Sequence, residues 1–139
     1  MNTTGVRIVI DTNVFITILS KKGKNRWIFD AIISGDFILC ITNNIFMEYW
    51  EILEAKTNSI VALNVIEFLI SHPYVYFFDT YIKWNLIALD ADDNKFADCY
   101  LSCNAQYLVT NDTHFLPLKN LSFPKVNLST TEEFKKSFQ

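Results

Sequence analysis

The chain has 139 residues, of which 50% are hydrophobic and 15% aromatic, and its formal net charge at pH 7 is −3. This composition excludes a disordered chain, and no apolar run is long enough to cross a bilayer. The N-terminus lacks the basic region, apolar region and small-residue cleavage site of an export signal, which predicts a cytoplasmic protein. Three cysteines, an odd number, argue against a disulfide framework.

The hydrophobic pattern alternates strands and helices along one domain, residues 1–139. Short apolar runs predict strands, and helical spacing of apolar residues predicts helices between them. The expected strands cover residues 6–10, 37–41, 74–78, 107–110 and 125–128, and the expected helices cover 13–20, 25–34, 44–56, 58–71, 92–104 and 130–138. Alternation of this kind indicates an α/β fold with a central parallel sheet that helices cover on both faces.

Two acidic residues stand just after predicted strands. Asp11 follows the strand 6–10, and Asp112 follows the strand 107–110. Ligands of open α/β sheets bind outside the carboxyl ends of the strands, so the two carboxylates could converge there. Converging carboxylates repel each other unless a cation neutralises them, and hard oxygen ligands select Mg²⁺ or Mn²⁺. The pattern favours a metal-dependent phosphoryl-transfer site, although Asp112 also fits a helix N-cap.

Glu48 is the acidic residue nearest the apolar face of the helix 44–56. On a helical wheel it lies beside Ile45 and Ile52, whereas Glu51 and Glu54 lie off the apolar arc. A carboxylate at that boundary is costly unless a cation or hydrogen bonds compensate it. The wheel therefore indicates either a site residue or a boundary residue whose carboxylate reaches solvent.

The densest acidic run covers residues 90–98. Acids at a helix start suit the macrodipole and cap the first amides, which alone explains Asp92. Asp93 shares the face of Phe96 and so points towards the packed side, whereas Asp98 points away from that face. Asp98 is open to two interpretations, a solvated residue or a second-tier acid that supports the site. His114, after Asp112, is interpreted as a surface or capping residue.

The one dense basic patch is the segment 21–26, with Lys21, Lys22, Lys24 and Arg26. Its simplest interpretation is a solvated loop between helices. Glycine-rich phosphate loops and nucleophile elbows are both missing from the sequence, so P-loop nucleotide chemistry and serine hydrolase chemistry are disfavoured.

Four segments together resemble PIN-domain ribonucleases. They are residues 7–15, 41–53, 92–99 and 107–115, in the family's order and with suitable spacing, and residues 126–134 resemble the family's closing strand and helix. The resemblance covers nearly the whole chain. Its nearest subgroup is the VapC-like toxin components of toxin–antitoxin systems.

The resemblance implies a three-layer α/β/α PIN-like fold and an endoribonuclease that uses Mg²⁺ or Mn²⁺. Its catalytic and metal-binding acids would be Asp11, Glu48, Asp93 and Asp112, with Asp98 as the alternative third acid, and its supporting polar residues Thr12, Asn13 and Thr110. The basic residues Lys21, Lys22, Lys24 and Arg26 would hold the RNA backbone. The implied partners are an RNA substrate, a small antitoxin protein and further copies of the chain, without a membrane.

Two other functions fit parts of the sequence. A DNA nuclease of the flap-endonuclease type is disfavoured because the short chain offers no obvious helical arch or duplex-binding module. A non-catalytic RNA-binding PIN module is disfavoured because all four acids are present.

Overall fold

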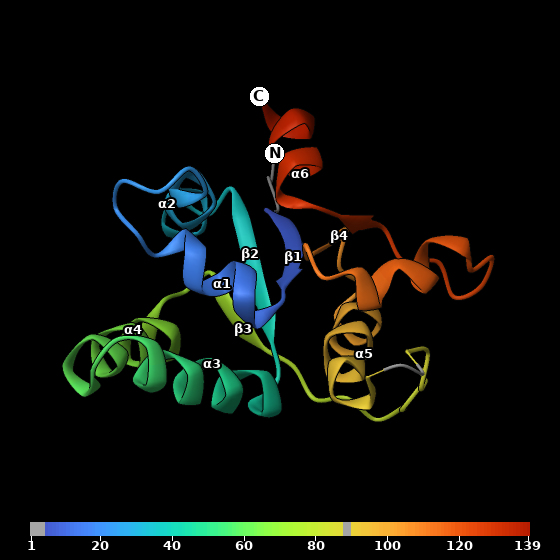
Figure 1. The fold of residues 1–139 in the computed structure, drawn as a ribbon, viewed down its shortest axis with the longest axis horizontal. Coiled ribbons are helices and arrows are strands. Elements are labelled where there is room, and N and C mark those ends of the chain that lie inside the picture. The colour runs from blue at the N-terminus through green and yellow to red at the C-terminus, as the bar shows by residue number, and fades with distance from the viewer. Residues whose placement is uncertain (1–4, 88–89) are drawn as a thin grey trace.

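The computed structural model describes residues 5–87 and 90–139, so the first four residues of the expected domain lie outside the described residues. Within this part of the chain, five parallel strands form one sheet in the order β3-β2-β1-β4-β5 (Figure 1). The strands are β1 (Val6–Ile10), β2 (Phe37–Ile41), β3 (Val75–Phe77), β4 (Tyr107–Val109) and β5 (Leu128–Ser129). The expected central parallel sheet is confirmed.

Helices cover both faces of this sheet. They are α1 (Thr12–Ile18), α2 (Arg26–Ser34), α3 (Asn43–Lys56), α4 (Ser59–Ser71), α5 (Asn94–Ser102) and α6 (Thr131–Phe138). Trp27 of α2 and Phe134 of α6 pack against Phe37 of β2. The Cys40 side chain, three residues further along the same strand and so on the opposite face, lies beside Cys103 at the end of α5. The expected three-layer α/β/α arrangement is therefore confirmed.

Two local expectations differ from the structure. The expected helix 92–104 is a 3₁₀ turn, η1 (Ala91–Asp93), followed by α5, and a second 3₁₀ segment, η2 (Thr113–Asn120), follows β4. The expected strand 125–128 is wrong, because β5 begins only at Leu128. The Leu128 N–H bonds back to the Val126 carbonyl at 3.1 Å, so the chain turns where the sequence pattern extends it.

The connection order places a topological switch point beside β1. The chain runs from β1 through β2 to β3 at one edge, and then returns to form β4 on the other side of β1. Ile10 is paired with Val109, and the Asp11 N–H donates to the Val109 carbonyl at 3.1 Å. The residues that follow β1 and β4 therefore leave the sheet side by side, where ligands bind in such folds.

Aromatic packing fixes α1 and α3 beside this switch point. The rings of Phe15 and Tyr49 stack with centroids 3.9 Å apart, and the Tyr49 hydroxyl donates to the Ile10 carbonyl. Both side chains are fully buried, and the contact ties α3 to the end of β1.

No helix in the described part of the chain is long and apolar enough to span a membrane.

Candidate active site

Asp11 is buried at the start of α1, where its carboxylate caps the helix. Its Oδ1 accepts the Val14 N–H at 2.8 Å, and its Oδ2 accepts the Thr110 hydroxyl. Burial is the main cause that raises the pKa of Asp11, and the charges of Asp112 and Glu48 raise it further. The two hydrogen bonds lower this pKa, but the net pKa remains above the ordinary value. Asp11 is therefore a fixed carboxylate in an environment that penalises its negative charge.

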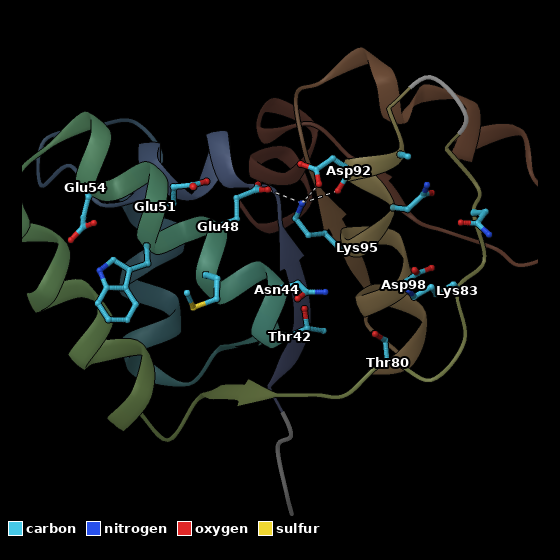
Figure 2. A pocket seen from close by; sticks show the side chains of 15 residues that line it. Thr42, Asn44, Glu48, Glu51, Glu54, Thr80, Lys83, Asp92, Lys95 and Asp98 are labelled. Carbon is cyan, nitrogen blue, oxygen red and sulfur yellow. Dashed lines mark hydrogen bonds and ion pairs between the residues drawn. The ribbon is translucent and has the colours of Figure 1, made fainter.

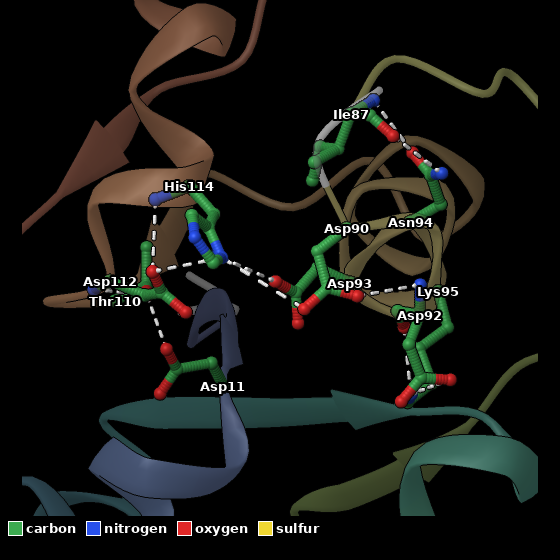
Figure 3. A network of polar contacts seen from close by, with 10 residues as sticks. All are labelled: Asp11, Ile87, Asp90, Asp92, Asp93, Asn94, Lys95, Thr110, Asp112 and His114. Carbon is green, nitrogen blue, oxygen red and sulfur yellow. Dashed lines mark hydrogen bonds and ion pairs between the residues drawn. The ribbon is translucent and has the colours of Figure 1, made fainter.

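Thr110 joins Asp11 to Asp112 across the ends of β1 and β4. Its hydroxyl oxygen donates to Asp11 and accepts the Asp112 N–H at 3.0 Å (Figure 3). Asp112 Oδ1 accepts the His114 N–H at 2.9 Å and so caps η2. The capping role expected for Asp112 is confirmed, and its charge also lies close enough to Asp11 to raise that residue's pKa.

Asp93 ends η1 and faces the same acidic group. Desolvation first, and then the charges of Asp90 and Asp112, raise the pKa of Asp93 to about 6, although Lys95 opposes the rise. Its Oδ2 is buried and has no hydrogen-bond partner among the described residues. A buried oxygen without a donor costs free energy, so this atom fits a site that is completed by a cation.

Glu48 reaches the site from α3 with both oxygens engaged. Oε2 accepts the Thr12 hydroxyl, and Oε1 lies 2.7 Å from the Lys95 ammonium (Figure 2). The boundary position that the helical wheel predicts for Glu48 is observed, since its side chain is 24% exposed. Glu51 is exposed, as the wheel also indicates.

Lys95 is a site residue that sequence reasoning missed. Its ammonium contacts Glu48 and also donates to the Asp92 carbonyl at 2.8 Å, with the Asp92 carboxylate at 3.3 Å. Burial lowers the pKa of Lys95, but the hydrogen bonds and charges of Glu48 and Asp92 outweigh this effect and raise it. Lys95 stands three residues after Asp92, the spacing of one helical turn, and this spacing was the available signal.

Asp98 lies apart from the acids around Asp11, and its interpretation as a solvated residue is wrong because the side chain is buried. It is buried, its Oδ1 accepts the Trp84 N–H at 3.1 Å, and burial is the main cause that raises its pKa. Lys83 is the charged neighbour that affects the pKa of Asp98, and its charge lowers that pKa. The acids around Asp11 are not among the causes of the shift. Asp98 and Glu48 line opposite sides of one cavity of about 890 Å³ between α3 and α5 (Figure 2).

The remaining predicted residues are Asn13 and the basic loop between α1 and α2. Asn13 is exposed and lines a smaller cavity of about 250 Å³ together with Asp11 and Asp112. The basic loop between α1 and α2 lies on the side of β1 opposite to α5 in Figure 1. Its lysines are exposed, whereas the Arg26 guanidinium donates to Asp30 at 3.1 Å and to the Leu19 carbonyl at 2.8 Å. Arg26 therefore holds its own loop and helix together.

His114 and Asp90 are further members of the acidic group. The sequence predicted no site role for either residue. His114 is a surface residue, as expected, with 47% of its side chain exposed. Its ring lies between Asp112 on one side and Asp90 and Asp93 on the other (Figure 3). The long connection from β3 to η1 brings Asp90 here, and sequence periodicity carries no signal for such a connection.

These side chains fit a divalent cation. Asp11 and Asp93 are desolvated carboxylates whose charges repel one another, and Asp93 carries a buried oxygen without a donor among the described residues. Oxygen ligands of this kind bind Mg²⁺ and Mn²⁺. The residues able to hold the ion lie on the ends of β1 and β4 and on η1, while Glu48 is held nearby by Thr12.

A family model described as PIN domain matches residues 7–114 of the chain. The chain is similar to one in the crystal structure of VapBC2 from Rickettsia felis bound to promoter DNA, with TM-score 0.63, 14% identity, and 90% of this chain and 98% of that chain covered. It is also similar to a chain of DNA-bound VapBC from Salmonella typhimurium, with TM-score 0.62, 21% identity and coverage of 91% and 98%. A chain of VapBC-1 from nontypeable Haemophilus influenzae has TM-score 0.59, 15% identity and coverage of 91% and 99%. Comparison with curated proteins gave no match.

Proposed function

Because the chain belongs to the PIN domain family, we propose that it is a metal-dependent endoribonuclease and the toxin component of a toxin–antitoxin pair. One observation carries the proposal. Carboxylates from two strand ends and from η1 converge at the switch point of the sheet, where the charge of Asp112 raises the pKa of Asp11 and both of these charges raise the pKa of Asp93. Catalysis of phosphodiester hydrolysis needs such a cation-binding cluster more than it needs a covalent nucleophile.

Asp11, Asp93 and Asp112 would hold the cation, with Glu48 beside them. When bound, a divalent ion lowers the pKa of the attacking water and offsets the negative charge that develops on the leaving oxygen. The protein's own groups supply position. The Val14 N–H and the Thr110 hydroxyl fix the carboxylate of Asp11.

The cavity between α3 and α5 is the proposed path of the RNA. Its lining includes Glu48, Lys95 and Trp50, so α3 offers an aromatic ring and α5 an ammonium group next to the acids. Lys95 would attract a phosphate towards Glu48, and Trp50 offers a surface on which an unpaired base can stack. Single-stranded or loop RNA suits such a cavity best, with the exposed lysines 21, 22 and 24 as further backbone contacts.

The partner is proposed from the structural relatives. Three of them come from VapBC structures, and two of these structures contain bound DNA. By analogy, a small antitoxin protein would bind this chain and cover the acidic site, and the nuclease would assemble as an oligomer in the cytoplasm. We infer a single nuclease domain across residues 1–139.

The test is cleavage of a mixed RNA pool and of single-stranded DNA of matched length, with Mn²⁺, with Mg²⁺ and with EDTA. Cleavage of RNA that requires the metal and leaves DNA intact supports the proposal. Metal-dependent cleavage of DNA alone would instead indicate a DNA nuclease. RNA that binds but stays intact under every condition would indicate a non-catalytic RNA-binding module.

A further inference from the structure

The imidazole of His114 points into the acidic cluster. Its Nδ1 lies 3.9 Å from Asp90 Oδ2, 3.9 Å from Asp93 Oδ2 and 3.6 Å from Asp112 Oδ1 (Figure 3). These separations are too long for direct hydrogen bonds. They are close to those of donor atoms around one cation, since two ligands about 2.1 Å from an ion lie at most about 4.2 Å apart. The donor atoms of Asp90, Asp93 and His114 all lie within 4.8 Å of one another.

Asp90 and His114 are each anchored by one group and turn another group towards the cluster. Asp90 Oδ1 accepts the Asp92 N–H at 3.1 Å, which leaves Oδ2 facing the ring of His114. The His114 backbone N–H donates to Asp112, which holds this residue beside the cluster. Asp93 Oδ2 is the buried oxygen that has no hydrogen-bond partner in the described part of the chain. Asp90 Oδ2, Asp93 Oδ2 and His114 Nδ1 therefore face one another at separations that suit the ligands of one cation.

We propose that His114 is the nitrogen ligand of a divalent transition-metal ion that Asp90 and Asp93 also bind, and that this ligand makes the chain prefer Mn²⁺ to Mg²⁺. The inference rests on the proposed function in one respect, because Asp93 belongs to both groups of ligands. Imidazole suits transition metals, whereas Mg²⁺ takes oxygen ligands and keeps its waters. Two carboxylates and one imidazole suit Mn²⁺, and along the divalent series Co²⁺ and Zn²⁺ bind such a site more tightly still.

The first test observes the two histidine rings of the wild-type protein by long-range ¹H–¹⁵N NMR at about pH 8, where free imidazole is neutral. Zn²⁺ serves as the probe because it is diamagnetic. We expect one equivalent of Zn²⁺ to shift Nδ1 of His114 and to leave His72 unchanged, since the His72 ring lies beside the Ile32 carbonyl and outside the cluster. Mg²⁺ at the same concentration should move neither ring. A His114 ring that stays in place with Zn²⁺, or two rings that shift equally, would overturn the assignment.

The second test compares affinities for Mn²⁺ and Mg²⁺ in His114→Asn and His114→Asp. His114 is half-exposed, so both variants should fold, which their melting temperatures check. Losing one ligand should weaken Mn²⁺ binding by His114→Asn about tenfold and Mg²⁺ binding less than about twofold. His114→Asp substitutes an oxygen ligand and should shift the preference towards Mg²⁺. An equal loss of both metals in His114→Asn would overturn the proposal.

RNA cleavage measured on the same samples separates this inference from the proposed function. A His114 ring that shifts with Zn²⁺ in a protein that cuts no RNA supports the metal ligand and removes the ribonuclease proposal. Metal-dependent cleavage of RNA with a His114 ring that does not respond supports the ribonuclease and overturns the ligand.

Discussion

Replacement of Asp93 by Asn should stabilise the metal-free protein, although it removes a proposed catalytic group. Burial and the neighbouring carboxylates raise the pKa of Asp93 from 3.8 to about 6 in the folded protein. The folded state therefore binds the proton more tightly than the unfolded state does. Stability falls as the pH rises from 3.8 to about 6, and the whole penalty applies above that range.

The size of the effect follows from this pKa difference. A rise of about two units corresponds to about 3 kcal/mol. Solvent reaches part of the Asp93 side chain, which is 18% exposed, so screening should reduce the penalty to about 1.5 kcal/mol. For a chain of this length that gain should raise the melting temperature of Asp93→Asn by about 5 °C at about pH 8 in EDTA, with little difference from wild type near pH 4.

Thermal unfolding with and without metal is the assay, with Asp98→Asn as the matched control. The side-chain amide oxygen introduced by Asp98→Asn can still accept the Trp84 N–H, so this variant loses a buried charge outside the acidic cluster. Millimolar Mn²⁺ should raise the melting temperature of wild type and of Asp98→Asn and should have little effect on Asp93→Asn. RNA cleavage should fall more in Asp93→Asn than in Asp98→Asn. A lower melting temperature for Asp93→Asn in EDTA at about pH 8 would refute the electrostatic reasoning, and the reverse order of activities would transfer the third-acid role to Asp98.

Three further outcomes are expected. Glu48→Gln should reduce cleavage on the order of a hundredfold and Glu51→Gln hardly at all, because only Glu48 lies beside the acids; equal losses would show that Glu48 has no special role. Neutralising Lys21, Lys22 and Lys24 together should weaken RNA binding and flatten its dependence on salt, and an unchanged slope would make this segment a solvated loop. The stabilisation of wild type by Mn²⁺ should shrink as the pH falls from about 8 to about 5, because protonated carboxylates release the ion; a gain that does not depend on pH would argue against carboxylate ligands.

The sequence was sufficient to predict the position of a side chain where a repeating structural rule determines that position. The parallel sheet places the residues after β1 and β4 together, so the proximity of Asp11 and Asp112 could be predicted from two strand ends. The helical period was enough to separate Glu48 from Glu51. In both cases a local pattern determines where a side chain points.

The sequence was insufficient to predict the position of a side chain where segments without regular secondary structure, or long flexible side chains, determine that position. Asp90 and His114 meet because a long connection and a 3₁₀ segment fold towards each other, and neither has a repeating pattern. The contact between Lys95 and Glu48 joins two helices through a long, flexible side chain, which a helical wheel cannot place. The late start of β5 depends on the turn before Leu128, a single backbone hydrogen bond.

The most direct measurement of the central claim is cleavage of one RNA pool by wild type and by Asp11→Asn, each with Mn²⁺ and with EDTA. The substitution keeps the side-chain volume and the acceptor for the Val14 N–H, so the fold should persist, which circular dichroism checks. The account predicts Mn²⁺-dependent cleavage by wild type, none in EDTA, and a loss on the order of a hundredfold or more in Asp11→Asn. Near wild-type cleavage by folded Asp11→Asn, or equal cleavage in EDTA, would contradict a metal-dependent ribonuclease centred on Asp11.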